Sequence, residues 1–206
     1  MSSIQEIVAE EWRQFQQVKN EGGRAACQDN WEEFRRQRES QFRAWSPELR
    51  ESYYQDLREA AAAGRNLLTE KYAYMMKETA PKRFAALARL LPPISREKQA
   101  LVESIVAVHL AWAGEFAAAF PLYAATGRPL RRTEAGPGET AIETYLRGEL
   151  STYSERTLGL YAAFAADCQA KGVNLARQIR DHAARDLGLS GSEEAEALLR
   201  RKYSRT

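Results

Sequence analysis

Apolar residues recur at helical spacing along almost the whole chain, and this pattern restricts the fold more than any other feature of the sequence. Near the N-terminus, one such stripe consists of Ile4, Ile7, Val8, Trp12, Phe15 and Val18. A spacing of three and four residues places side chains on one face of an α-helix. Runs that alternate between apolar and polar residues, as β-strands do, are too short to be useful. The sequence therefore predicts an all-α fold.

Capping residues, glycines and prolines divide the pattern into about eight or nine helices, two of them long. Ser46 followed by Pro47 marks one helix start, because serine caps a helix and proline fits its first turn. The two long helices are expected over 95–120 and 140–171. Between them, the glycines and prolines of 126–140 predict a long, locally basic loop.

Length and charge limit the class of protein. A chain of 206 residues suits one domain, so we expect a single helical-bundle-like domain over 1–206, with a helical appendage at about 190–206. A formal net charge of +2 is too small for the concentrated basic face of nucleic-acid-binding proteins. The N-terminus has no secretory signal core, and no run approaches the roughly 18 apolar residues of a membrane span. We therefore expect a cytoplasmic protein that binds neither nucleic acid nor membranes.

The segment 21–34, EGGRAACQDNWEEF, is the first candidate site. Asp29 as a helix N-cap, with Glu32 three residues later, has the spacing of a capping box. In a second interpretation, these two carboxylates border a reaction site, where one takes a proton from an amine or hydroxyl. Capping does not explain Arg24 and Gln28, and an arginine offers several donors to a sulfate, phosphate or carboxylate. Both interpretations stay open.

The cysteines and histidines give no separate catalytic or metal motif. Cys27 is interpreted as a buried small hydrophobe, because a catalytic cysteine normally needs a nearby base and the chain has only His109 and His182. Four carboxylates that a di-iron site would use lie on three separate predicted helices: Glu70, Glu115, Glu143 and Glu149. The Glu-x-x-His pairs of such sites are absent. No metal and no cofactor is therefore predicted, and a carboxylate-rich metal oxygenase is the less favoured alternative.

Two helical faces are further candidate walls of a pocket. Glu70, Tyr74 and Lys77 share one face of the helix that follows Gly64. That face either lines a pocket or carries a solvated pair of charges. Spacing along the helix does not show whether this face and the other candidate segments meet in one cavity.

The second face carries Glu143 and Arg147, an ion pair of favourable orientation one helical turn apart. Gly148 follows them, although glycine inside a helix costs about 1 kcal/mol relative to alanine. Such a glycine indicates close packing or the close approach of a ligand. The alternative for this face is a ladder of ion pairs on the surface.

Longer strings of the sequence resemble a known family. NEGGRAACQDNWEEF, SQFRAW, GRNLLTEKYAYMM, LPPIS and ETYLRGELSTYSERTLGLY together resemble the bacterial domain-of-unknown-function family 4125, over about 12–176. The resemblance implies an all-helical fold. The name of this family confers no activity.

The chain also resembles the aziridine-forming proteins of azinomycin-type natural-product pathways. This resemblance implies closure of a three-membered ring by attack of an amine on a carbon that bears a sulfate ester. The substrate would be an amino acid attached to an acidic amino-group carrier protein, and a small partner subunit would accompany the enzyme. Neither a redox cofactor nor a metal would be needed.

That chemistry needs a base and a site for an oxyanion. Asp29 with Glu32 is the expected base. The departing sulfate needs cations and hydrogen-bond donors where charge develops, and Arg24, Ser95 and Arg147 are the candidates. Ser95 is also the expected cap of the first long helix. Tyr74 and the loop TEAGPG differ from the wider family, so no role is carried over there.

A protein without enzymatic activity is the main alternative. In this hypothesis the chain is a helical adaptor that binds a partner through the basic loop with Arg128, Arg131 and Arg132 and through the basic C-terminal tail. An adaptor would lose binding when the loop arginines are replaced. An enzyme would lose turnover when its base is replaced.

Overall fold

The computed structural model is built of helices joined by short connections, and it describes residues 2–20, 22–137 and 139–204. In these ranges it contains eleven α-helices, three short 3₁₀ segments and no strand, which confirms the predicted all-α fold. Gly138 of the predicted loop 126–140 lies outside the described residues.

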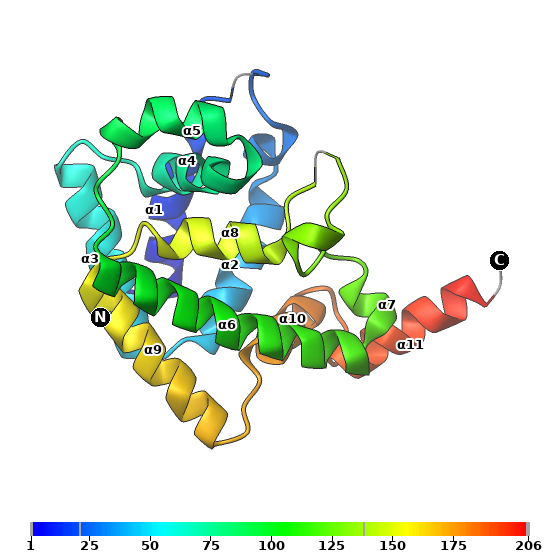
Figure 1. Cartoon of the computed structure of the whole chain (residues 1–206). Coiled ribbons are helices and arrows are strands. Elements are labelled where there is room, and N and C mark those ends of the chain that lie inside the picture. Colours follow the sequence, from blue (N-terminus) through cyan, green and yellow to red (C-terminus); the bar gives the residue numbers. More distant parts are fainter. Residues whose placement is uncertain (1, 21, 138, 205–206) are drawn as a thin grey trace.

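Helices far apart in the sequence lie side by side in the fold. Their order is α1 (Ile4–Gln16), η1 (Ala26–Asp29), α2 (Trp31–Ala44), α3 (Pro47–Ala62), α4 (Leu67–Thr79), α5 (Pro81–Leu87), η2 (Ala88–Leu90), α6 (Arg96–Ala119), α7 (Pro121–Ala124), η3 (Arg132–Glu134), α8 (Ile142–Leu150), α9 (Glu155–Ala170), α10 (Leu175–Asp186) and α11 (Ser192–Tyr203). The long α6 packs against α8, α9 and α10, and α4 packs along α8 (Figure 1). The candidate site lies among α4, α5, α6 and α8.

Most of the predicted helix starts are confirmed by their caps. Ser46 and Ser95 each accept a hydrogen bond from a backbone N–H of the first turn, as the sequence predicts. The prediction for Asp29 is wrong by one residue. Asn30 caps α2, and its side chain accepts from the Glu33 amide at 3.1 Å. Asparagine and aspartate cap equally well, so local propensity does not decide between them.

The predicted second long helix is wrong, because the chain breaks between α8 and α9. Ser151 and Thr152 donate their hydroxyls to backbone carbonyl oxygens of the preceding turn. Such bonds compete with the helical ladder. Ser154 then caps α9 by accepting from the Thr157 amide at 3.1 Å. The 95–120 helix is confirmed as α6.

The hydrophobic core has two parts. The larger part includes apolar side chains from α1, α2, α3, α4, α6, α8 and α9. The smaller part joins the end of α6 and α7 to α10 and α11 through Phe116, Phe120, Tyr123, Ala184 and Ala195. Glu196 of α11 also accepts from the Tyr123 amide at 2.8 Å. The predicted C-terminal appendage is therefore a helix with its own packed contact.

Gly148 marks a close approach of α4 and α8. A Cβ at this position would lie 2.5 Å from Cγ of Met75 and 2.9 Å from the carbonyl oxygen of Lys71. These distances are far below van der Waals contact, so only glycine lets the two helices pack here. The sequence leaves two explanations for this glycine, close packing or the close approach of a ligand, and the structure supports close packing.

The helix α6 has an unexpected composition. Its 24 residues include a window with a mean hydropathy of 1.3, so by length and composition alone it meets the criteria for a membrane span. The sequence expectation that no run approaches a span is wrong in this respect. In the fold, α6 buries Val102, Ile105, Val106 and Leu110 against other helices. Core helices of this kind meet the same criteria.

His109 of α6 is a buried titratable group in this core. Its ring contacts Trp112 and Tyr161 edge-on, with centroid distances of 5.2 and 5.4 Å. Burial lowers the pKa of His109 from 6.5 to about 4, although Glu149 opposes the change. The folded state therefore keeps this imidazole neutral at pH values where the unfolded chain binds a proton.

Replacing His109 by Leu is expected to flatten the acid dependence of stability. A lowered folded-state pKa means that stability is complete above pH 6.5 and falls as the pH drops toward 4. This residue alone is expected to remove about 3 kcal/mol over that window. Urea unfolding of wild type and His109→Leu at pH 7, 5.5 and 4 measures the difference. Equal slopes for the two proteins would contradict the prediction.

Candidate functional site

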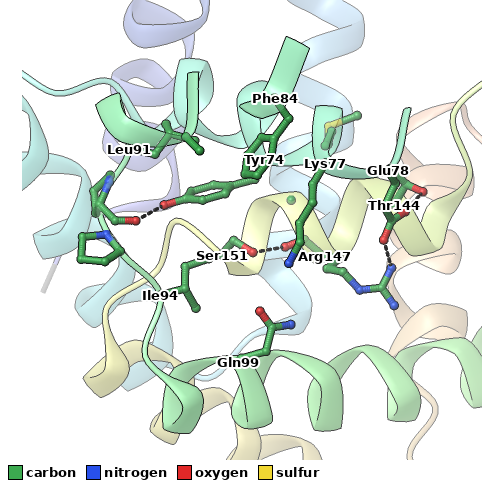
Figure 2. Close-up of a pocket in the computed structure, with 15 residues that line it drawn as sticks. Tyr74, Lys77, Glu78, Phe84, Leu91, Ile94, Gln99, Thr144, Arg147 and Ser151 are labelled. Atoms are coloured by element: carbon green, nitrogen blue, oxygen red, sulfur yellow. Dashed lines mark hydrogen bonds and ion pairs between the residues drawn. The ribbon is translucent and has the colours of Figure 1, made fainter. Parts of the chain in front are cut away.

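A cleft with two compartments lies beside α8. The apolar cavity, about 230 Å³, is lined by residues of α4, α5, the 91–94 segment, α6 and α8 (Figure 2). The open cavity, about 500 Å³, is lined by Glu78, Arg132, Thr133, Glu143 and Arg147. Glu78 and Arg147 line both cavities. We call the two compartments together the Arg147 cleft.

Arg147 holds three carboxylates from different helices at the boundary of the two cavities. Its Nη1 donates to Glu78 of α4 at 2.5 Å, and its Nε donates to Glu103 of α6 at 3.0 Å. Nη2 donates to Glu143 of α8 at 3.2 Å. Thr144 donates to the second oxygen of Glu78 at 2.6 Å. The guanidinium therefore gathers α4, α6 and α8 around one point.

Three carboxylates face the one guanidinium of Arg147, and the cations Lys77 and Arg132 also line the two cavities. Burial by itself opposes ionisation of Glu143, but the Arg132 amide and the Arg147 guanidinium lower its pKa. Burial likewise opposes the charge of Arg147, and its carboxylate partners outweigh this and raise its pKa. Arg147 is therefore a permanent cation, and its three carboxylate partners hold it in place.

The apolar cavity has a hydrophobic wall on one side and several polar and charged groups on the other. Phe84 of α5 and Leu91 point toward it from one side, and Tyr74 lies along it (Figure 2). The Tyr74 hydroxyl donates to the Pro92 carbonyl oxygen at 2.7 Å, and burial raises its pKa to about 12. Tyr74 is therefore a neutral hydrogen-bond donor that fixes the segment after η2.

The structure brings four of the residues singled out in the sequence together in the cleft: Tyr74, Lys77, Glu143 and Arg147. Six others do not line either cavity: Arg24, Gln28, Asp29, Glu32, Glu70 and Ser95. The predicted face of α4 and the predicted face of α8 therefore converge, while the 21–34 segment stays apart.

Gln28 has a structural role. Its side chain is 1% exposed and donates to the carbonyl oxygens of Phe15 and Val18 at 2.9 and 3.0 Å. Its oxygen accepts from Ala25 and Asn20 at 3.0 Å each. All the hydrogen-bonding capacity of this amide is used to attach η1 to the end of α1.

The two predicted catalytic carboxylates lie on the surface. Asp29 pairs with Arg24 at 2.7 Å, and both side chains are largely exposed. Glu32 pairs with Arg35 at 2.9 Å, and its side chain is 70% exposed. Exposed pairs of this kind contribute little and do not shield a reaction from water. The geometry gives no support to a base at these two positions.

The remaining sequence candidates also have structural partners. Glu70 accepts two hydrogen bonds from Arg65, both at 2.7 Å. Ser95 caps α6 and donates to Glu155 at 2.8 Å. Cys27 is exposed, so its interpretation as a buried hydrophobe is wrong, whereas Cys168 is buried.

A buried charge network supports the cleft from behind. Arg38 of α2 contacts Glu11 of α1 at 2.6 Å and Glu149 of α8 at 3.0 Å. Lys71 of α4 contacts the other oxygen of Glu149 at 2.5 Å. Burial opposes the charge of Glu149, but Arg38 and Lys71 outweigh it and lower its pKa. Because Glu149 follows Arg147 by two residues, the network fixes α8 against α1, α2 and α4.

The carboxylates of a di-iron site are not gathered. Glu149 binds Lys71, Glu143 binds Arg147, and Glu115 accepts from Asn174 at 2.9 Å. Among the described residues, no group of three or more His, Cys, Asp and Glu side chains has a geometry that holds a metal ion. The alternative of a carboxylate-rich metal oxygenase has no support in this donor set.

Sequence reasoning missed Glu78 and Glu103 in the cleft and Glu11 and Arg38 in the network. Glu78 and Arg147 are 69 residues apart, and Glu103 and Arg147 are 44 apart, so no local spacing joins them. Arg38 lies in the strongly charged stretch WEEFRRQRESQFR, where a buried arginine resembles its exposed neighbours. Gly148 was the one sequence feature that indicated close packing on α8, and it could have pointed to α4 as the helix that supplies Glu78.

Comparison with protein families supports the early resemblance. The family model described as "Protein of unknown function (DUF4125)" matches residues 1–197. This range includes the Arg147 cleft and the buried charge network. No curated protein and no solved structure matches the chain.

Proposed function

The chain belongs to the DUF4125 family, whose description assigns no activity, and we propose that its Arg147 cleft is the active site of a cofactor-independent biosynthetic enzyme. The enzyme closes an aziridine ring by intramolecular attack of an amine, with loss of sulfate from an amino acid bound to a carrier protein. One observation carries the proposal: Arg147 joins three carboxylates at the boundary of an apolar and an open cavity.

Glu78 is the proposed base. It lines both cavities, and its side chain is only 21% exposed. The protonated amine of the substrate gives a proton to the Glu78 carboxylate. The nitrogen lone pair then attacks the neighbouring carbon, the new C–N bond forms, and the C–O bond to sulfate breaks.

Arg147 links the proton transfer to Glu78 with the departure of the sulfate. While Glu78 is ionised, Nη1 of Arg147 is committed to it at 2.5 Å. Protonation of Glu78 removes that negative charge, so Nη1 of Arg147 becomes available to the sulfate as its charge develops, while Nε and Nη2 stay bound to Glu103 and Glu143. A cation that is already in position stabilises a leaving oxyanion without reorganisation.

The basic loop is the proposed docking site for an acidic carrier protein. Arg128, Arg131 and Arg132 are exposed, and Arg132 also lines the open cavity. A carrier bound there presents its tethered amino acid directly to Glu78 and Arg147. The small partner subunit expected from the resemblance is part of the same proposal and has no assigned surface.

A turnover assay tests the function. The protein is co-expressed with the proposed small partner subunit and given a carrier-linked amino acid with a vicinal amine and sulfate ester. Mass spectrometry is expected to show loss of the sulfate mass. An intact substrate in the presence of folded protein and its partner would refute the proposal.

The Asp29→Asn variant distinguishes the cleft from the 21–34 segment. Because Asp29 is exposed and lines neither cavity, its replacement is expected to leave turnover within about twofold of wild type. The same mass-spectrometric assay measures it. A loss of more than tenfold with an unchanged circular dichroism spectrum would return the base to Asp29.

The helical adaptor remains the second candidate, because the three loop arginines are exposed. An adaptor binds its acidic partner but converts no substrate. Arg131→Ala with Arg132→Ala would abolish binding in a pull-down, while Glu78→Gln would bind normally. Absence of turnover combined with this binding pattern would favour the adaptor.

A further inference from the structure

We propose that the apolar cavity binds a short aliphatic chain that ends in a carboxylate, and that Lys77 is its anchor. The inference deepens the proposed function. It rests on that function for the view that the bound aliphatic carboxylate is one arm of the substrate. The binding itself requires no turnover and is tested separately.

The charge of Lys77 is the first argument. Its side chain is exposed and extends from α4 toward α8 beside the cavity that it lines (Figure 2). Among the described residues, Lys77 forms no ion pair, whereas the neighbouring Glu78 binds Arg147 and Thr144 with its two oxygens. An ammonium group beside an apolar wall therefore faces a carboxylate that is already neutralised, and it attracts a further anion.

The wall of the cavity indicates the chemistry and the size of the part of the ligand that does not contact Lys77. Met75, Phe84, Leu91 and Ile94 supply apolar surface, which favours an aliphatic or other apolar chain. The volume of about 230 Å³ is below the range of roughly 300–1,000 Å³ that is usual for ligand pockets, so only a small ligand fits. At about 30 Å³ for each water-sized group, it holds roughly eight non-hydrogen atoms. Hexanoate has this size and this combination of an apolar chain and a carboxylate.

The polar groups near Lys77 already have hydrogen-bond partners within the protein. Ser151 donates its hydroxyl to the Arg147 carbonyl oxygen at 2.7 Å, so it does not compete for the anion. The amide nitrogen of Gln99 donates to Glu103 at 2.6 Å. These two donors are therefore committed, and Lys77 is the cation that distinguishes a carboxylate from a neutral amide.

Titration with hexanoate and hexanamide tests the inference. The two compounds have the same length and differ in charge, and binding to the isotope-labelled full chain is followed by NMR. Hexanoate is expected to bind at least tenfold more tightly than hexanamide and to perturb the signals of Phe84, Leu91 and Ile94. Equal affinities for the two compounds would overturn the proposal. So would the absence of hexanoate binding at about 50 mM, which is 50 times a dissociation constant of about 1 mM.

Matched variants locate the anchor. Lys77→Met is expected to remove the preference for hexanoate, whereas Lys82→Met, an exposed position of α5 that does not line the cavity, keeps it. A preference that survives Lys77→Met would overturn the proposal. Since no step of the assay uses the sulfate-bearing substrate, failure here is separable from failure of the proposed reaction.

Discussion

Glu78→Gln is expected to reduce turnover of the sulfate-bearing substrate by about two to four orders of magnitude, the usual contribution of a positioned base. Glutamine keeps an oxygen that accepts from Thr144, whose bond to Glu78 is 2.6 Å long, so the packing of α4 on α8 is preserved. It does not accept a proton from the amine. Single-turnover rates measured by mass spectrometry at saturating substrate give the change.

Two control variants make this result specific. Glu97→Gln removes a carboxylate from an exposed position on α6 and is expected to have wild-type turnover. Glu103→Gln removes a carboxylate that also binds Arg147, at 3.0 Å, but that lines neither cavity. If Glu103→Gln loses as much activity as Glu78→Gln, the assignment of the base to Glu78 is wrong.

Arg38→Met is expected to lower the free energy of unfolding by about 3–5 kcal/mol, because it leaves Glu11 buried without a cation. Glu11 is fully buried and has Arg38 as its ion-pair partner at 2.6 Å. The Tyr53 hydroxyl donates to the same carboxylate at 2.6 Å, but it supplies no charge. Urea unfolding at pH 7, followed by circular dichroism, measures the loss.

Arg35 provides the matched control for this prediction. It lies on the same helix, its side chain is 39% exposed, and it pairs with Glu32 and Glu39. Arg35→Met is therefore expected to cost at most about 1 kcal/mol. Combining Arg38→Met with Glu11→Leu removes the stranded charge and is expected to recover part of the stability. Equal losses for the Arg35 and Arg38 variants would show that the network does not carry this energy.

The local features of the fold were predictable, since they depend on neighbours in the sequence. Ser46 and Ser95 cap helices as expected, and the i, i+4 pair of Glu143 and Arg147 forms at 3.2 Å. The break between α8 and α9 was not predicted, because the apolar pattern continues through it. Hydroxyl groups of Ser151 and Ser154 decide that boundary, and their hydrogen bonds are invisible to hydrophobic periodicity.

The candidate site was predicted only in part, for a similar reason. Arg147 was identified from its own helix, but its partners Glu78 and Glu103 come from two other helices. Asp29 and Glu32 attracted attention because unusual residues cluster around them, and that cluster proved to attach η1 to α1 through Gln28. Spacing along one helix predicts one wall of a cleft, and the opposite wall is set by tertiary packing.

The short helix α5 and the η2 segment after it are held to the rest of the protein by few buried contacts. This segment covers the apolar cavity, yet none of its side chains is buried, and Leu90 is 73% exposed. Segments with so few buried contacts open locally at a small cost in free energy, long before the core unfolds. The amides of α5 should therefore exchange with solvent much faster than those of α4. Opening of this one helix would therefore uncover one wall of the cavity while the rest of the protein stays folded.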